Sequence, residues 1–293
     1  MASQNQKPSF VFFGTPDLAV SALEGLSKHG YLPTAIVTSP DKPVGRHQVL
    51  SPSPTKVWGL AHHIPVLEPA KIDDAFFAEL STLNFELGIV AAYGKILPEK
   101  LLTMPTFGTL NIHPSLLPLY RGTAPVVGPI LAGDIKTGVS IIKLDAKVDH
   151  GPIMFQDERI LTGNERANDL GNELFCHGGE MLSKIIPEYI LGKIILTEQD
   201  HTKATFTKKI KKEDGLVDLG VELPSVLWRK YRAYYGWPGI YFMDKNNKRV
   251  KITDAMYEDG MFKIQKVIPE GKKEVRYEDF VRASTNLGSP SPK

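Results

Sequence analysis

Short apolar runs alternate with amphipathic, helix-like stretches along the first half of the chain. The apolar runs cover residues 9–13, 34–39, 87–93 and 108–113, and the helix-like stretches include residues 18–30, 53–63 and 73–83. Such alternation predicts an α/β fold with a mostly parallel, Rossmann-like sheet. The first turn, Gly14-Thr15-Pro16-Asp17, lacks the G-x-G-x-x-G spacing, so we expect this fold without a dinucleotide cofactor.

The pattern changes after residue 150. An apolar segment at 151–161 and an amphipathic stretch at 168–190 predict a further strand and helix. A polar stretch rich in Lys and Thr follows, and short strand candidates separated by turns then occupy residues 237–244, 246–259 and 260–271. These candidates predict a small C-terminal β-barrel of the OB-like kind. We therefore predict a catalytic α/β domain at 1–195, a linker at 196–207, and a β-barrel domain at 208–293 that ends in a disordered tail.

The composition is that of an ordinary globular protein, with 42% hydrophobic and 23% charged residues among 293. The single cysteine, Cys176, excludes an internal disulfide, and no Cys/His cluster has metal-ligand spacing. We expect Cys176 to be a buried, small apolar residue. The first residues lack a basic region followed by an apolar stretch, and no window reaches the roughly 18 apolar residues of a membrane span. These features predict a cytoplasmic protein without membrane contact.

Charge is distributed unevenly along the chain. Residues 201–293 hold 19 Lys and Arg against 12 Asp and Glu, whereas residues 1–200 hold 16 against 21. Clustered basic side chains attract polyanions such as nucleic acids. A solvated basic surface explains the same counts, so charge alone leaves both interpretations open.

Two segments carry candidate chemistry. Residues 110–125 contain an apolar strand that ends in Asn111 and His113, which share a face because side chains two apart in a strand point the same way. Asp149 lies in the turn-like Val148-Asp149-His150-Gly151. Asn and His can donate hydrogen bonds to an oxyanion, and Asp can orient His and accept a proton. The three residue types suit acyl transfer to an amine, although each also occurs as an ordinary turn or strand-end residue.

The sequences NIHPSLLPLYRGTAP (111–125) and TGVSIIKLDAKVDHGPI (137–153) resemble the signature segments of the folate-dependent formyltransferases. This resemblance implies that the formyl donor is 10-formyltetrahydrofolate and that Asn111, His113 and Asp149 are catalytic. We expect no metal, because carbonyl activation is already assigned to Asn111 and His113. The resemblance also implies a folate site made by the loop after the histidine and by AAYGKILP (91–98). The implied folate-binding residues are Tyr93, Gly94, Ile96, Leu97, Ser115, Leu116, Leu117 and Pro118.

The acceptor amine varies within this family. Residues 13–26, the insertion at 39–59 and residues 268–283 resemble the branch that formylates initiator methionyl-tRNA for translation initiation. His47, Gln48 and Val49 follow Arg46 where this branch often has lysines, which weakens the expected loop contact with tRNA. The implied tRNA-binding residues are Lys42, Arg46, Lys208, Lys209, Lys211 and Lys212.

Two other functions compete with tRNA formylation. A nucleotide amino-sugar formyltransferase shares the loop pattern and a two-domain layout, but the arginine-bearing loop at 40–55 disfavours it. A catalytically silent RNA-binding homologue would keep the fold, but the presence of Asn111, His113 and Asp149 disfavours it. We expect the chain to act as a monomer on initiator methionyl-tRNA and a folate.

Overall fold

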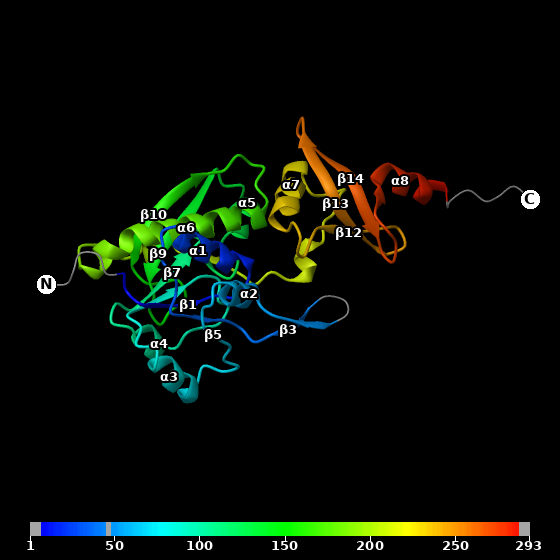
Figure 1. The fold of residues 1–293 in the computed structure, drawn as a ribbon. Coiled ribbons are helices and arrows are strands. Elements are labelled where there is room, and N and C mark those ends of the chain that lie inside the picture. The colour runs from blue at the N-terminus through cyan, green and yellow to red at the C-terminus, as the bar shows by residue number, and fades with distance from the viewer. Residues whose placement is uncertain (1–6, 45–47, 287–293) are drawn as a thin grey trace, which may run out of the picture. The chain divides into compact units, whose positions relative to one another are not determined.

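The computed structural model describes residues 7–44 and 48–286. The chain divides into two compact units (Figure 1). The first unit comprises residues up to 125, 136–160 and 169–208, and the second comprises residues 126–135, 161–168 and those from 209 onward. The second unit therefore contains two short segments that lie within the sequence of the first.

A seven-stranded sheet forms the centre of the first unit. Its order is β10-β9-β7-β6-β1-β2-β5. Strands β1, β2, β5, β6 and β7 pair in parallel, whereas β9 pairs antiparallel with both β7 and β10. The strands are β1 (Phe10–Phe13), β2 (Ala35–Val37), β5 (Val66–Leu67), β6 (Leu87–Val90), β7 (Thr109–His113), β9 (Lys136–Lys143) and β10 (Ile153–Ile160).

Both faces of this sheet are buried, which explains the continuous apolar runs of its strands. Phe10 and Phe12 belong to one core cluster, with side chains from α1 and α6, while Val11 and Phe13 belong to a second cluster on the opposite face, with α3 and α4. Period-two alternation in a strand produces this division. The helices of the first unit are α1 (Asp17–Ser27), α2 (Pro54–Ala61), α3 (Asp74–Ser81), α4 (Glu99–Leu102) and α6 (Ala167–Ile190).

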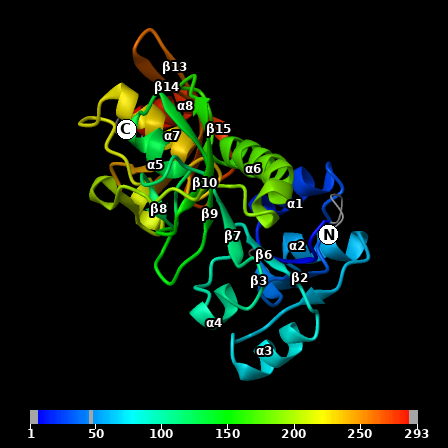
Figure 2. The same ribbon diagram turned by 90° about the vertical axis from the view of Figure 1, so that its left-hand side faces the viewer.

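Helices α1 and α6 lie side by side (Figures 1 and 2). Their backbones approach closely because glycines occupy the crossing. A Cβ atom on Gly25 would collide with the carbonyl oxygen of Cys176, and one on Gly179 would collide with that of Ala22. The two glycines therefore set the distance between these helices.

Two small strand pairs extend the first unit. Strand β3 (Lys42–Val44) pairs with β4 (Val49–Ser51) in a hairpin that extends away from the sheet (Figure 1). Strand β8 (Arg121–Gly122) pairs in parallel with β11 (Phe206–Thr207), which follows the short 3₁₀ helix η1 (His201–Lys203). Both η1 and β11 lie within the predicted linker and belong to the first unit.

The second unit contains a four-stranded antiparallel sheet in the order β12-β13-β14-β15. Its strands are β12 (Tyr241–Met243), β13 (Arg249–Glu258), β14 (Met261–Pro269) and β15 (Val275–Arg276). The same unit holds η2 (Lys212–Gly215), α5 (Val127–Ala132), α7 (Pro224–Ala233) and α8 (Tyr277–Asn286).

The predicted fold class is confirmed: a mostly parallel Rossmann-like sheet precedes a small antiparallel β domain. The limits of the predicted domains at 195 and 208 stay predictions. The prediction that Cys176 is buried is wrong, because its side chain is half-buried and its Sγ accepts a hydrogen bond of 3.3 Å from Lys28 Nζ. The predicted disordered tail lies outside the described residues apart from its first residue, Asn286.

Gly25→Ala should lower the free energy of unfolding by about 1–3 kcal/mol, because the added methyl group overpacks the contact between α1 and α6. Urea denaturation measures this change. Lys184→Ala, at an exposed position of α6, is the control and should stay within about 0.5 kcal/mol of the parent protein. Equal stability of Gly25→Ala and the parent would show that the two helices can separate freely.

Candidate active site

Strand β7 carries Asn111 and His113 on one face, as its period predicts. Both side chains are buried, with exposed fractions of 9% and 4%. The intervening Ile112 belongs to the core cluster with α1 and α6, so the two polar side chains point toward the opposite face of the sheet. Their position at the carboxyl end of a parallel strand is where open α/β sheets bind ligands.

Asp149 reaches the same place from the loop between β9 and β10. Its backbone is left-handed, with φ of 47°, a conformation that is uncommon for residues other than glycine. One carboxylate oxygen, Oδ2, accepts a hydrogen bond of 2.8 Å from the backbone N–H of Gly122 in β8. The other, Oδ1, lies 3.5 Å from Asn111 Nδ2 and 3.6 Å from His113 Nδ1. The structure therefore brings the three predicted catalytic residues together.

The surroundings of His113 constrain its protons. Its Nε2 lies 3.1 Å from the carbonyl oxygen of Tyr120. A carbonyl only accepts, so Nε2 must donate. Its other ring nitrogen, Nδ1, lies 3.6 Å from Asp149 Oδ1, beyond hydrogen-bond distance. The Tyr120 carbonyl thus fixes the orientation of the ring, and Nδ1 is the nitrogen nearer the Asp149 carboxylate.

Two backbone groups that the sequence did not predict complete this site, the Tyr120 carbonyl and the Gly122 N–H. Both belong to the loop and strand that follow the histidine, and both act through the main chain. No side-chain pattern could have revealed them. Their shared segment keeps His113 and Asp149 at a fixed separation.

The loop of predicted folate-binding residues 115–118 is hydrogen-bonded to Ser140 of β9. Ser140 Oγ donates to the carbonyl oxygen of Ser115 at 2.6 Å and accepts from the N–H of Leu117 at 3.1 Å. The Ser115 hydroxyl itself is buried and donates to the carbonyl oxygen of Leu119 at 2.7 Å. Leu117 is buried, whereas Leu116 and Pro118 are partly exposed. Ser115 therefore supports the loop, and the partly exposed side chains are available for contact.

The second predicted folate segment follows β6. Tyr93 and Leu97 are buried, while Gly94 and Ile96 are exposed, Ile96 to 80%. A Cβ atom on Gly94 would meet no atom within 4 Å, so open space lies beside it. The Tyr93 hydroxyl is buried without a hydrogen-bond partner among the described residues, and burial raises the pKa of Tyr93 to about 12. This phenol stays protonated and has an unused donor.

The predicted tRNA-binding residues lie in two places. Lys42 is exposed in the β3–β4 hairpin, whereas Arg46 lies outside the described residues. All four predicted lysines at 208–212 are exposed, Lys208 at the end of the first unit and the others at the beginning of the second. Their exposure makes them available to a polyanion.

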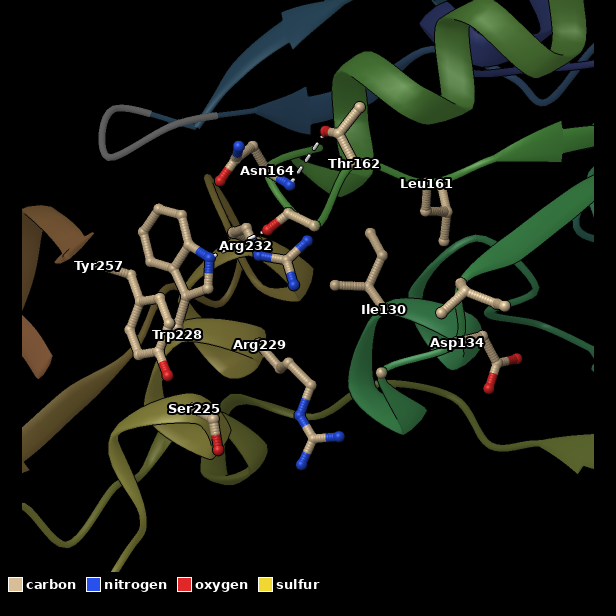
Figure 3. A pocket seen from close by; sticks show the side chains of 13 residues that line it. Ile130, Asp134, Leu161, Thr162, Asn164, Ser225, Trp228, Arg229, Arg232 and Tyr257 are labelled. Carbon is tan, nitrogen blue, oxygen red and sulfur yellow. Dashed lines mark hydrogen bonds between the residues drawn. The ribbon is translucent and has the colours of Figure 1, made fainter. Parts of the chain in front are cut away.

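A pocket of about 470 Å³ lies within the second unit, lined by residues of α7 and of the segments 126–135 and 161–168 (Figure 3). Hydrogen bonds from α7 join these segments. Arg229 Nη1 donates to the carbonyl oxygen of Ala132 at 2.7 Å, and Trp228 Nε1 donates to that of Gly163 at 3.0 Å. None of the predicted site residues lines this pocket. Its polar groups connect the parts of the second unit.

Among the described residues, no group of three or more His, Cys, Asp or Glu side chains is arranged to hold a metal ion. No helix in the described part of the chain is long and apolar enough to cross a membrane.

Comparisons with known proteins match the two parts of the chain separately. Residues 8–186 match the family model for formyl transferase, and residues 209–262 match that for the C-terminal domain of formyl transferase. The chain therefore belongs to the formyl transferase family, whose members use formyl-folate donors.

Two similar curated proteins are methionyl-tRNA formyltransferases. The methionyl-tRNA formyltransferase of Chloroflexus aggregans is 48% identical over 259 residues, which cover 86% of this chain and 83% of that protein. The methionyl-tRNA formyltransferase of Halalkalibacterium halodurans is 36% identical over 300 residues, with 94% of each chain covered. The fold is also similar to that of an N-formyltransferase from Helicobacter canadensis in complex with folinic acid and dTDP-3-aminofucose, with a TM-score of 0.60, 19% identity, and coverage of 92% of this chain and 99% of that one.

Tyr93→Phe should raise the free energy of unfolding of the unliganded protein by about 1 kcal/mol, because it removes a buried hydroxyl without a partner. Urea denaturation of the two proteins measures the difference. Tyr189→Phe is the matched control, since the Tyr189 hydroxyl donates to the carbonyl oxygen of Phe107 at 2.6 Å and its removal should be destabilising. A loss of stability in Tyr93→Phe would mean that its hydroxyl is hydrogen-bonded in the free protein.

Proposed function

We propose that this chain transfers the formyl group of 10-formyltetrahydrofolate to the α-amino group of methionine on initiator methionyl-tRNA. The main observation behind this proposal is that Asn111 Nδ2 and His113 Nδ1 both lie within 3.6 Å of Asp149 Oδ1. The names of the relatives that match most of the chain support the choice of acceptor. Because charged tRNA is used in translation, we propose a cytoplasmic location, and we propose that the active protein is a monomer.

The reaction forms one C–N bond and breaks another. The neutral α-amine attacks the formyl carbon, and the carbonyl oxygen becomes an oxyanion in the tetrahedral intermediate. Asn111 Nδ2 and a protonated His113 Nδ1 donate hydrogen bonds to that oxygen. Asp149 accepts the proton that the attacking nitrogen loses. The bond to N10 of the folate then breaks, and N10 takes the proton from Asp149, which leaves formyl-methionyl-tRNA and tetrahydrofolate.

The folate site of this proposal is the loop 115–118 together with residues 93–97. Ser140 fixes the loop through two main-chain groups, so its partly exposed side chains keep a constant position. The open space beside Gly94 and the unused Tyr93 donor lie at the second segment. These features suit a flat, partly apolar ligand with a few hydrogen-bonding groups.

The proposed tRNA contacts are basic side chains, and those among the described residues are exposed. Lys208, Lys209, Lys211 and Lys212 form one run in the sequence, and Lys42 lies in β3, whereas Arg46 lies outside the described residues. Lysines contact phosphates without reading sequence, which positions a nucleic acid rather than selecting it. Selection among acceptors then depends on the methionine and on the end of the tRNA.

His113→Ala should lower kcat for formyl transfer to initiator methionyl-tRNA by roughly 10²–10³-fold, because it removes one donor to the oxyanion. The Kd for tRNA should stay almost unchanged, because this contact strengthens only in the transition state. His177→Ala is the control, since His177 also pairs with a carboxylate, that of Asp157, but at a half-exposed position on α6. Equal losses of kcat and tRNA affinity in His113→Ala would contradict the catalytic role.

The same assay separates the competing functions. An amino-sugar nucleotide is offered as acceptor beside the charged tRNA. Transfer to the sugar alone would keep the chemistry and overturn the acceptor. Absence of transfer to either, with tRNA still bound, would identify a silent RNA-binding protein.

The double variants Lys208→Gln/Lys209→Gln and Lys211→Gln/Lys212→Gln should weaken tRNA binding and reduce its salt dependence. The plot of the log of the tRNA association constant against log salt has a negative slope. Its steepness should decrease by roughly 0.7–0.9 for each phosphate that a lysine no longer neutralises. Filter binding at several salt concentrations measures the slope. Lys184→Gln/Lys193→Gln, two exposed lysines near the end of α6 and after it, is the matched control. A slope equal to that of the parent would remove these lysines from the interface.

A further inference from the structure

Gln199 lies between Arg121 and the loop that carries Asp149, and it is buried. Its Nε2 donates to the carbonyl oxygen of Asp149 at 2.9 Å and to that of Gly151 at 2.7 Å. Its Oε1 accepts from Arg121 Nε at 3.2 Å and from Arg121 Nη2 at 2.6 Å. One amide side chain thus joins a buried guanidinium to the main chain of the active-site loop.

The chemistry of the partners fixes the orientation of this amide. A guanidinium only donates and backbone carbonyls only accept, so Oε1 must face Arg121 and Nε2 must face the loop. Glutamate has nearly the same shape but has no donor when ionised. Glutamine can therefore make all four contacts, and glutamate can make only the two with Arg121.

Arg121 is itself held firmly. Its side chain is 3% exposed, and Nη2 also lies 2.8 Å from His201 Nδ1. Its backbone N–H donates to the carbonyl oxygen of Thr205 at 2.9 Å, and its carbonyl oxygen accepts from Thr207 Oγ1 at 3.0 Å. The pairing of β8 with β11 thus fixes the backbone of Arg121, whose side chain binds Gln199.

The same strand β8 holds Asp149 at its other end. The N–H of Gly122 binds the carboxylate, while Arg121, through Gln199, binds the carbonyl oxygen of Asp149. The left-handed conformation of Asp149 has a backbone cost that its surroundings offset. The hydrogen bonds from Gly122 and Gln199 hold Asp149 in this conformation. A Cβ atom on Gly151 would collide with the carbonyl oxygen of Lys143, so the loop also packs closely against the end of β9.

We propose that Gln199 and Arg121 are positioning residues that fix the Asp149 carboxylate beside Asn111 and His113. This inference rests on the proposed role of Asp149 in formyl transfer. Neither residue touches the reacting atoms; they act on the backbone that carries Asp149. A shift of about 1 Å in a catalytic group can lower a rate by roughly 10²-fold, so this support governs turnover rather than binding.

Gln199→Glu tests the proposal, because it keeps the size and the contact with Arg121 but removes the donor to the loop. We expect kcat to fall roughly 10- to 100-fold while KM for the folate and for the acceptor changes less than about twofold. The thermal midpoint should not fall by more than a few degrees, since the carboxylate gains an ion pair with Arg121. Amide hydrogen exchange in residues 144–152 should accelerate, because the loop loses two hydrogen bonds.

Asn172→Asp is the matched control, the same change from amide to carboxylate at an exposed position of α6, where Ser21 Oγ donates to Asn172 Oδ1 and can donate equally to a carboxylate. It should leave kcat and the exchange of residues 144–152 unchanged. Arg121→Lys is the second variant, which keeps the charge but loses the paired donors, and its kcat should lie below that of the parent.

A Gln199→Glu protein with kcat within twofold of the parent and unchanged exchange in residues 144–152 would overturn the positioning role. Failure of the proposed function looks different, because the unsubstituted protein would then transfer no formyl group to methionyl-tRNA. If it transfers to another amine, kcat is compared on that acceptor. If it transfers to none, the exchange of residues 144–152 alone decides whether Gln199 holds the loop.

Discussion

The site depends on one short segment, residues 120–122, whose main chain contacts two catalytic side chains. The Tyr120 carbonyl accepts from His113, and the Gly122 N–H donates to Asp149. Since backbone positions two residues apart cannot change their separation freely, the distance between the imidazole and the carboxylate is set by peptide geometry rather than by flexible side chains. This segment keeps its place because Thr205 accepts from the N–H of Tyr120 and Thr207 donates to the carbonyl oxygen of Arg121. Without that pairing, the site would loosen while every catalytic side chain stayed present.

The sequence predicted the sheet well because its strands are buried on both faces. Continuous apolar residues such as Phe10–Phe13 leave little alternative to a central strand. The period of a strand also predicted that Asn111 and His113 share a face. The antiparallel direction of β9 and β10 was not predicted, because an apolar run such as Val139–Ile142 reads the same in either direction.

The meeting of Asp149 with β7 could not be derived from spacing, since it depends on a loop and on the pairing of β8 with β11. Gln199 was missed for a related reason: it lies in a polar stretch whose composition predicts a linker, and its importance comes from four hydrogen bonds with distant partners. Cys176 was misjudged because a helix position next to buried Phe175 still faces Lys28. The assignment of folate and tRNA contacts to individual residues remains a set of predictions.

The pairing of β8 with β11 also bears on how far the catalytic part of the chain extends. A fragment that ended at residue 195 would contain Asn111, His113 and Asp149, yet it would lack Gln199, Thr205 and Thr207, which hold the strand and the loop around them. Truncation at residue 195 would therefore preserve the catalytic side chains and the sheet but remove the hydrogen bonds that hold β8 and the Asp149 loop in place. In this chain the last residues needed to shape the reaction centre come far beyond the last catalytic one in the sequence, immediately before the basic run begins.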